Sequence, residues 1–428
     1  MELKAGYKQT DLGIFPDEWA IEPLGRHAGF RTGPFGSALH KSDYTSDGVP
    51  IVNPMHIVGG KIEPTRTMTL TEEAARKLSD FQLKAGEIVI ARRGDMGRCA
   101  VVQEEHDGWI CGTGSMIIRP YNADPTFLQR VLSSRRAIAA IKDASVGTTM
   151  VNLNQATLSG LAIQFPPLPE QRAIATASSD VNALLGGLDR LIAKKRELRQ
   201  AALQQLLTGR TRLPGFSGEW DVKRLGDCVT FLRHGVNSRS ELVPEGRVKY
   251  LHYGEVHACK DVYLSPVSLP CLPVAKATLL DRLRDGDLVF ADASEDVAGV
   301  SKSVEIRNVG NTELVAGLHT ITARFDRSIL ANGFKGFLQY CPQFSTHLRR
   351  LAAGTKVYAT NRAHVASVEM RLPSVAEQAA IAAVLSDMDA EIASLEARRE
   401  KTRDIERAMM HELLTGATRL PLSQVPDA

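Results

Sequence analysis

The sequence has few of the features that would set it apart from ordinary folded proteins. Its 428 residues include six cysteines, none of them in a CxxC pair or beside a set of histidines, so neither a zinc site nor a disulfide framework is indicated. No run of 18 or more apolar residues occurs, which excludes a membrane-spanning helix. The opening MELKAGYKQTDLG lacks the apolar centre of a signal peptide. We therefore expect a cytoplasmic protein with reduced cysteines and no membrane partner.

The sequence also lacks the motifs of common catalytic sites. There is no GxxxxGK[ST] phosphate loop, HExxH motif or deaminase zinc motif, and the acidic residues and lysine of a nuclease are absent at their usual spacing. Asn53-Pro54-Met55 is only superficially similar to an adenine methyltransferase motif, and no glycine-rich cofactor loop precedes it. We expect no catalytic residue, metal or cofactor in this chain. An enzyme that uses unrecognised loop residues is the alternative, and cofactor binding by the isolated chain would favour it.

The composition indicates a folded protein without a dominant charge. Hydrophobic residues make up 43 % and charged residues 24 %, values typical of globular proteins, and the length fits roughly two to four domains. Lys and Arg number 52 against 49 Asp and Glu, a formal net charge of +3. Composition alone therefore does not indicate a nucleic-acid-binding protein.

An internal repeat organises the chain. A shift of 207 positions aligns 167–214 with 374–421 without a gap, and 20 of these 48 positions are identical, including LLTGRTRLP against LLTGATRLP. Shifts of 201 and 200 align EWAIEPLG with EWDVKRLG and LKAGEIVIA with LRDGDLVFA. Each half is thus predicted to be a globular unit followed by a long helix, with approximate two-fold symmetry. Because GFSGEW after the first TRLP has its counterpart near the N-terminus, GIFPDEW, we predict that the chain ends lie close together.

The repeated segments have the apolar period of long helices. Between Glu170 and Thr208 there is no proline and apolar spacings of three, four and seven dominate; Gly209 and Gly416 stand where C-terminal caps are expected. About 39 residues at about 1.5 Å each give a rod of roughly 58 Å. Segment 166–210 has 7 basic against 4 acidic residues, and 373–428 has 6 against 10. We predict that the two helices form an antiparallel coiled coil; two ordinary core helices in separate domains are the alternative.

The globular units are predicted to be α+β, with short strands and a helix near the end of each. The expected strands are 48–56, 86–91, 100–102 and 116–119 in the first unit and 248–253, 287–291, 304–306 and 319–325 in the second.

Basic and amide side chains in the loops suggest binding to DNA. Arg suits guanine, Asn suits adenine and Lys suits phosphate. The candidates are Arg31, His40, Lys41, Arg92, Arg93, Arg98, Thr148 and Asn154 in the first unit, and Arg233, His234, Asn237, Arg239, Tyr250, His252, Lys302, Lys356, Asn361 and Arg362 in the second. The alternative for each is ordinary solvent-exposed surface, and Asn53, His56 and His252 are equally consistent with polar groups satisfied inside the core.

The order of these motifs resembles that of the specificity subunits of Type I restriction-modification enzymes over nearly the whole chain. The resemblance rests on the strings beginning at Trp19 and Trp220, on GPFGSALHKSDY with GVPIVNPMHI after it, on the GT loop before PPLPEQRAIA, on EQAAIA, and on the twin LLTG helix ends. The second unit departs from this pattern, because RHGVNSRSEL stands where GPFGS would be expected.

The resemblance implies a non-catalytic DNA-recognition subunit. It divides the chain into target recognition domain 1 (1–165), conserved long helix 1 (166–210), target recognition domain 2 (211–372), conserved long helix 2 (373–416) and a C-terminal tail (417–428). Each recognition domain would recognise half of a bipartite site in double-stranded DNA, and the helices would set the spacer.

The implied partners are two methyltransferase (modification) subunits and the restriction/translocase subunits, with S-adenosylmethionine, ATP and Mg in those partners. Candidate subunit-interface residues are Glu170, Gln171, Ile174, Leu188, Glu377, Gln378, Ile381 and Leu395. The alternatives are the recognition subunit of a two-component Type II system and a non-catalytic protein scaffold.

Overall fold

The computed structural model describes residues 4–34, 39–144, 152–352, 354 and 356–421. By their contacts they form two compact units, unit 1 (Met1–Gly187 with Arg399–Ala428) and unit 2 (Leu188–Arg398). Each unit therefore includes one half of each long helix. In the part of the chain that the structure describes, no helix is long and apolar enough to cross a membrane.

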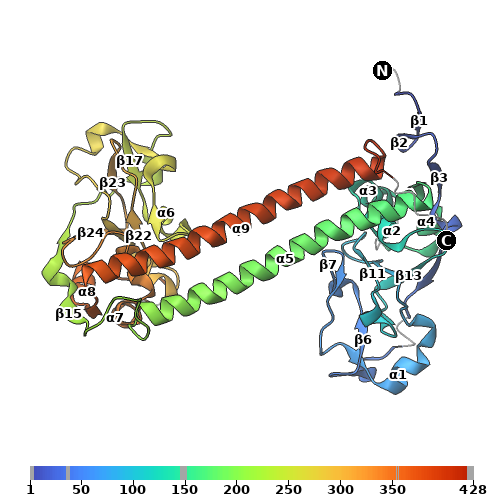
Figure 1. Ribbon diagram of the computed structural model, residues 1–428, viewed down its shortest axis with the longest axis horizontal. Helices are drawn as coiled ribbons and strands as arrows, with labels where there is room; N and C mark the ends of the chain where they lie inside the picture. Colours follow the sequence, from blue (N-terminus) through green and yellow to red (C-terminus); the bar gives the residue numbers. More distant parts are fainter. Residues whose placement is uncertain (1–3, 35–38, 145–151, 353, 355, 422–428) are drawn as a thin grey trace. The chain divides into compact units, whose positions relative to one another are not determined.

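Each unit is a mixture of helices and short strands (Figure 1). Unit 1 contains β1 (Tyr7–Thr10), β2 (Gly13–Pro16), β3 (Ala20–Pro23), β4 (Ala28–Thr32), β5 (Tyr44–Thr45), β6 (Val49–Val52), β7 (Ile57–Val58), β8 (Lys61–Ile62), β9 (Thr69–Leu70), α1 (Glu72–Lys77), β10 (Ile88–Ala91), β11 (Cys99–Val101), β12 (Ile110–Cys111), β13 (Ser115–Pro120), α2 (Pro125–Leu132), α3 (Arg135–Asp143), α4 (Gln155–Gly160) and β14 (Ala162–Phe165). Unit 2 contains β15 (Asp221–Arg224), β16 (Val229–Phe231), β17 (Val248–Leu251), α6 (Tyr253–Ala258), β18 (Tyr263–Leu264), β19 (Cys271–Leu272), β20 (Leu288–Ala291), β21 (Ala293–Ser294), β22 (Ser303–Ile306), β23 (Glu313–Ala316), β24 (Thr320–Phe325), α7 (Pro342–Leu351), β25 (Tyr358–Ala359), α8 (Arg362–Ala366) and β26 (Glu369–Leu372).

The main sheets of the two units have matching strand registers. Unit 1 has the order β11-β10-β13-β4, and unit 2 has β16-β24-β20-β22-β18. In unit 1, Ile88 lies opposite Val101 and Ile118; in unit 2, Leu288 lies opposite Glu305 and Ala323. All four residues of β10 and of β20 are buried. These central strands are the apolar runs that follow LKAGE and LRDGD in the repeat, and burial on both faces explains why they do not alternate with polar residues.

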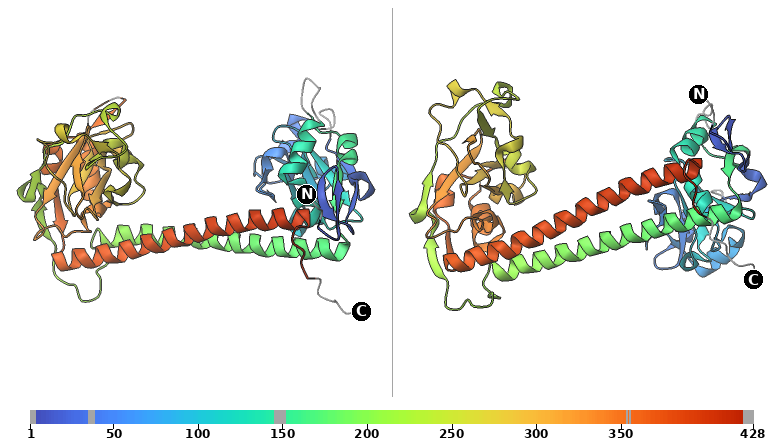
Figure 2. Two further views of the ribbon diagram at one scale, coloured as in Figure 1. Left: turned by 90° about the horizontal axis from the view of Figure 1, so that it is seen from above. Right: turned by 45° about the horizontal axis from the view of Figure 1, so that its top comes forward.

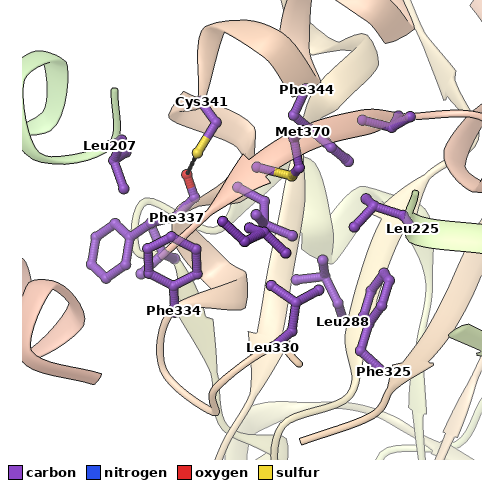
Figure 3. Close-up of a cluster of buried hydrophobic side chains, with 14 of the residues drawn as sticks. Leu207, Leu225, Leu288, Phe325, Leu330, Phe334, Phe337, Cys341, Phe344 and Met370 are labelled. Carbon is purple, nitrogen blue, oxygen red and sulfur yellow. Dashed lines mark hydrogen bonds between the residues drawn. The ribbon is translucent and has the colours of Figure 1, made fainter. Parts of the chain in front are cut away.

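The core of unit 2 shows how the sheet, the short helices and the long helices pack together. Leu288 from β20, Phe344 from α7 and Met370 from β26 lie in one apolar cluster with Leu207, just after the first long helix (Figure 3). Unit 1 has a corresponding cluster that includes Met410 and Leu413 of the second long helix. Each unit therefore buries its sheet against the end of one long helix and the beginning of the other.

The two long helices are α5 (Leu168–Leu206) and α9 (Val375–Thr415), which confirms both predicted helices to within a few residues. Each is followed by its predicted glycine, Gly209 and Gly416, in the left-handed conformation (φ +68° in both). Within each unit, the segments of α5 and α9 run side by side in opposite directions (Figures 1 and 2).

Ion pairs join the two helix segments of unit 2. Lys195 Nζ lies 2.6 Å from Glu391 Oε1, and Arg199 donates to both carboxylate oxygens of Asp389, from Nε and from Nη2. From the first of these pairs to the second, the basic residue lies further along the chain and the acidic residue lies earlier in it, as antiparallel pairing requires. In unit 1 the Tyr7 hydroxyl donates to the Gly416 carbonyl at 2.7 Å, which confirms that a segment near the N-terminus lies against the end of α9.

Candidate nucleic-acid interface

In unit 1, four loops meet at the ends of the central strands. We call residues 53–56, 92–98, 112–114 and 152–154 the unit 1 loop cluster. The backbone N–H of Gly112 donates to Val52, that of Arg92 to Gly114, and that of Leu153 to Arg92, at 2.9 to 3.0 Å. Four segments far apart in the sequence are thus held in one place by the strand framework.

Unit 2 holds the corresponding loops with the same bonds. We call residues 252–257, 292–302, 317–319 and 358–361 the unit 2 loop cluster. Here Gly317 donates to Leu251 at 2.8 Å, Asp292 to His319 at 3.1 Å, and Thr360 to Asp292 at 2.8 Å. The two units therefore share one backbone arrangement at this surface.

The side chains at matching positions differ in charge and size. The backbone bonds pair Arg92 with Asp292, and Gly114 with His319. They also pair Arg98 with Lys302, whose carbonyls accept from Ala91 and Ala291 respectively. A shared frame that carries different polar groups suits the recognition of two different targets.

The structure corrects the strands expected at 48–56 and 248–253. β6 ends at Val52 because Asn53 begins a capping box in which the Asn53 N–H donates to His56 Nδ1. β17 ends at Leu251 because the His252 ring accepts from the Gly254 N–H and begins α6. His56 and His252 are buried, so both belong to the polar groups satisfied inside the unit.

Three arginines of unit 1 lie in its loop cluster, in different environments. Arg93 is exposed, and Arg98 is exposed with its Nε 2.8 Å from Asp95. Arg92 is only 6 % exposed; its Nε donates to Asn152, and its Nη1 has no partner among the described residues. Burial lowers the pKa of Arg92. Arg93 and Arg98 are thus available to a ligand, whereas Arg92 supports the loop from within.

The other candidates of unit 1 are more dispersed. Arg31 on β4 pairs with Asp80 at 2.7 Å and lies over the Phe81 ring, and His40 is exposed. Asn154 caps α4, where its side chain accepts from the Thr157 N–H at 2.8 Å. Thr148 lies outside the described residues, as does the Lys41 side chain. Asn154 is therefore already engaged within unit 1.

The candidates of the RHGVNSRS loop are partly held by acidic neighbours. Arg233 lies 3.8 Å from Asp281, and Arg239 pairs with Glu255 at 2.9 Å. The Asn237 side chain donates to Glu241, and one His234 ring nitrogen lies 3.2 Å from the Gly235 carbonyl. Exposed Arg239, next to the start of α6, is the loop residue best placed beside the unit 2 loop cluster.

Tyr250 lies in the core, where it cannot present a surface to DNA. Its side chain is fully buried, its hydroxyl donates to the Asn237 carbonyl, and the same oxygen accepts from the Leu318 N–H. Gly317 packs so closely on this ring that a Cβ would lie 2.3 Å from it. Tyr250 therefore ties the 233–239 loop to the turn before β24, which corrects its assignment as a contact residue.

The remaining candidates of unit 2 lie at or near its loop cluster. Lys302 is half-buried and donates to the Cys259 carbonyl at 2.8 Å, while Lys356 is exposed. Asn361 caps α8 by accepting from His364, and Arg362 donates to the Leu232 carbonyl. Their positions beside the 292–302 loop follow from the short β21–β25 pairing, which joins Ala293 to Ala359.

Most residues assigned to a subunit interface are inaccessible, so a direct contact with a partner would fall to their neighbours. Glu170, Gln171, Ile174, Leu188, Glu377, Gln378 and Ile381 are buried, and Leu395 is half-buried. Gln171 accepts from the Asp124 N–H, and Gln378 accepts from the Ala331 N–H. Glu170 and Glu377 form internal ion pairs with Arg419 and Arg212.

Sequence reasoning missed two members of the unit 2 loop cluster, Asp292 and His319. His319 Nδ1 lies 3.1 Å from Asp292 Oδ1, and the Tyr253 ring packs edge-on to His319 with centroids 5.5 Å apart. The repeat aligned the strands before Arg92 and Asp292, and following that alignment into the loops would have found Asp292. Nothing in the sequence indicated His319. Among the residues that the structure describes, no group of three or more metal-ligating side chains is placed to hold an ion.

Comparison with known proteins places the unit 1 loop cluster in a named domain. Residues 35–190 match the family model described as the Type I restriction modification DNA specificity domain. A putative type I restriction enzyme MjaX specificity subunit of Methanocaldococcus jannaschii is 21 % identical, with 97 % of each chain covered. The MjaVIII specificity subunit of the same organism is 22 % identical over 78 % of this chain and 77 % of the relative. The resemblance to Type I specificity subunits is therefore confirmed.

Solved structures support the same fold. The Type I restriction-modification S subunit from M. genitalium superposes with a TM-score of 0.58 at 14 % identity, covering 96 % of this chain and 98 % of that one. A chain from a structure concerned with complex assembly of the type I R-M system superposes with a TM-score of 0.53 at 18 % identity, covering 94 % and 99 %. At these identities the likeness shows the fold alone.

Proposed function

We propose that this chain, a relative of Type I restriction enzyme specificity subunits, is the DNA sequence-specificity subunit of a Type I restriction-modification complex. In this proposal, target recognition domains 1–165 and 211–372 each recognise one half of a bipartite site in double-stranded DNA. The observation that carries it is the pair of loop clusters, which have the same backbone bonds but different side chains at matching positions. A common frame with Gly114 in one unit and the half-exposed His319 in the other fits half-sites of different sequence.

The two long helices, 166–210 and 373–416, form an antiparallel coiled coil in this proposal and set the spacer between the half-sites. The ion pairs of Lys195 and Arg199 across the two helices support this pairing in unit 2. On α5, Leu184, Leu191 and Leu198 recur every seven residues and are 41 to 46 % exposed. A heptad stripe left open on a paired helix suits docking of the two methyltransferase subunits.

The chain acts without catalysis or cofactor of its own in this proposal. S-adenosylmethionine is assigned to the methyltransferase subunits, and ATP and Mg to the restriction/translocase subunits, all in the cytoplasm. DNA affinity is shared with those partners, since the modest net charge of +3 offers few phosphate contacts. Binding by the isolated chain should be weak and salt-sensitive, and tight specific binding should appear only in the complex. Nanomolar binding by the isolated chain at physiological salt would contradict this division.

The test is co-expression with the methyltransferase encoded beside this chain, in a host without DNA methylation, followed by single-molecule sequencing of modified adenines. A gapped, asymmetric motif that disappears when this chain is omitted would establish the function and give both half-sites. Two folded, co-purifying proteins that produce no motif would favour the scaffold alternative. A motif together with DNA cleavage beside the site by the same two proteins would favour the two-component Type II alternative.

A further inference from the structure

The turn before β24 places an unusual residue at the centre of the unit 2 loop cluster. His319 is one of three described non-glycine residues with a positive φ (+57°), a conformation that costs energy for a side chain with a Cβ. The turn is fixed on both sides, because Gly317 donates to Leu251 and the His319 carbonyl accepts from Asp292. A strained residue that its surroundings hold in place is a reasonable candidate for a functional role.

The side chain of His319 is oriented by its neighbours and remains accessible. Its Nδ1 lies 3.1 Å from Asp292 Oδ1, and the two side chains are 50 % and 29 % exposed. Tyr253, from the start of α6, packs edge-on against the ring. The ring is thus held from two elements, with half of its surface open.

The carboxylate of Asp292 decides which ring nitrogen carries the proton. An ionised carboxylate can only accept, so Nδ1 is the donor in this pair. In the neutral ring the other nitrogen, Nε2, then has a free lone pair and acts as an acceptor. The pair therefore presents acceptor atoms to a ligand, in contrast to the donors of Arg93 and Arg98 in unit 1.

The chemistry of DNA bases gives this acceptor a partner. In the major groove only adenine N6 and cytosine N4 carry amino donors, whereas guanine and thymine offer acceptors to Nε2 at their N7, O6 and O4 atoms. We propose that His319, oriented by Asp292, is a specificity-determining residue of unit 2 that accepts a hydrogen bond from the exocyclic amino group of an adenine or cytosine. This inference rests on the proposed function and names one contact within it.

The conformation of His319 provides a variant that should fold. Glycine adopts φ +57° without strain, and the matching position of unit 1 is Gly114, so His319→Gly removes the ring without straining the turn. Asn308→Gly is the matched control, because Asn308 is exposed, has φ +58° and lies between β22 and β23, outside the unit 2 loop cluster. Asp292→Asn tests the orienting group separately.

The first measurement is the modified motif of each variant, co-expressed with the methyltransferase. His319→Gly should relax the base preference at one position of one half-site and leave the other half-site and the gap unchanged. Asp292→Asn should relax the preference at the same position. Asn308→Gly should keep the wild-type motif. An unchanged motif in His319→Gly would overturn the inference alone. Absence of any gapped motif from the wild-type complex would instead overturn the proposed function, and the inference with it.

The second measurement removes the amino group from the DNA. Adenine at the relaxed position is replaced by purine, or cytosine by 2-pyrimidinone, and binding by the purified complex is measured. The wild-type complex should lose about tenfold in affinity or more, and the His319→Gly complex should lose none. An equal loss in both complexes would show that another group accepts this hydrogen bond and would overturn the assignment of His319.

Discussion

Two buried glutamates explain why the same residues repeat at both ends of the helices. Glu170 accepts from the Trp19 ring N–H at 3.0 Å and pairs with Arg419, which follows α9. Glu377 pairs with Arg212, which follows α5 and lies over the Trp220 ring. The TRLP string after each helix therefore supplies the cation for the first turn of the other helix.

Loss of one of these cations should destabilise unit 1. Arg419→Ala leaves Glu170, which is 1 % exposed, as a buried charge, and should lower the free energy of unfolding by about 2 kcal/mol, less than for a fully buried pair because Arg419 is itself partly exposed. Arg407→Ala is the control, since its pair with Asp404 is exposed on both sides and should contribute less than about 1 kcal/mol. Urea unfolding measures both, and equal losses would contradict the prediction.

Two buried histidines should make unit 1 sensitive to acid. His56 Nδ1 accepts from the Asn53 N–H and His106 Nδ1 from the Gln103 N–H, and burial lowers the pKa of both rings. The folded chain therefore binds these protons less readily than the unfolded chain, whose histidines titrate near about 6.5. Stability should be complete above that pH and decline as the pH falls through and below it.

The measurement is the free energy of unfolding at pH 7.5 and at pH 5. His56→Asn keeps an acceptor without a titrating ring, so the loss on acidification should be smaller than in the wild type. His411→Ala, which removes an exposed histidine of α9, should leave the loss unchanged. If His56→Asn loses as much stability on acidification as the wild type, other groups control the acid response.

At the residue scale, the sequence indicated which basic and polar residues lie in the loops, but not which of their side chains are exposed. Arg93, Arg98 and Lys356 are exposed as a contact role requires, whereas Tyr250 is buried. An aromatic residue two positions before a histidine looks the same in a sequence whether its ring faces DNA or the Gly317 turn. Glu170 and Glu377 were assigned to an interface for a similar reason, because their arginine partners lie more than 150 residues away along the chain.

At the scale of elements, periodicity and caps were sufficient to predict the helices. The glycines after α5 and α9 have the predicted left-handed conformation, and the central strands lie where the repeated apolar runs placed them. The strand ends at Val52 and Leu251 were missed because they depend on side-chain caps made by Asn53 and His252. Such local hydrogen bonds override an apolar pattern within one or two residues.

At the scale of elements, alanine substitution of two glycines should change the stability in opposite directions. Gly187, inside α5, has no atom within 4 Å of a Cβ position, so Gly187→Ala should stabilise the chain by about 1 kcal/mol. Gly416 has φ +68°, and a Cβ there would lie 2.6 Å from Pro16, so Gly416→Ala should destabilise by about 1 kcal/mol or more. Thermal unfolding of the two variants checks both signs, and a stabilised Gly416→Ala would contradict the assigned cap.

At the scale of the whole molecule, the repeat in the sequence corresponds to two units built on the same strand registers. The pairing of β10 with β13 matches that of β20 with β24. The correspondence continues into the loops after these strands, where almost no sequence identity remains. That divergence is why alignment of the halves lost the position of His319, although the backbone bonds of its turn are those of Gly114. The loop side chains vary while the backbone hydrogen bonds that hold the loops stay the same.

If the long helices set the spacer, lengthening both should lengthen the gap between the half-sites. Seven residues inserted after Gly187 in α5 and seven after Arg398 in α9 keep the heptad phase and add about 10.5 Å to each helix. DNA rises about 3.4 Å per base pair, so the gap in the modified motif should grow by up to about three base pairs while both half-sites stay the same. The control is the same insertion in α5 alone. It lengthens only one of the two helices that Arg199 and Asp389 join, and should therefore abolish modification. A gap that stays at its original length in the double insertion would show that the helices do not determine the spacing.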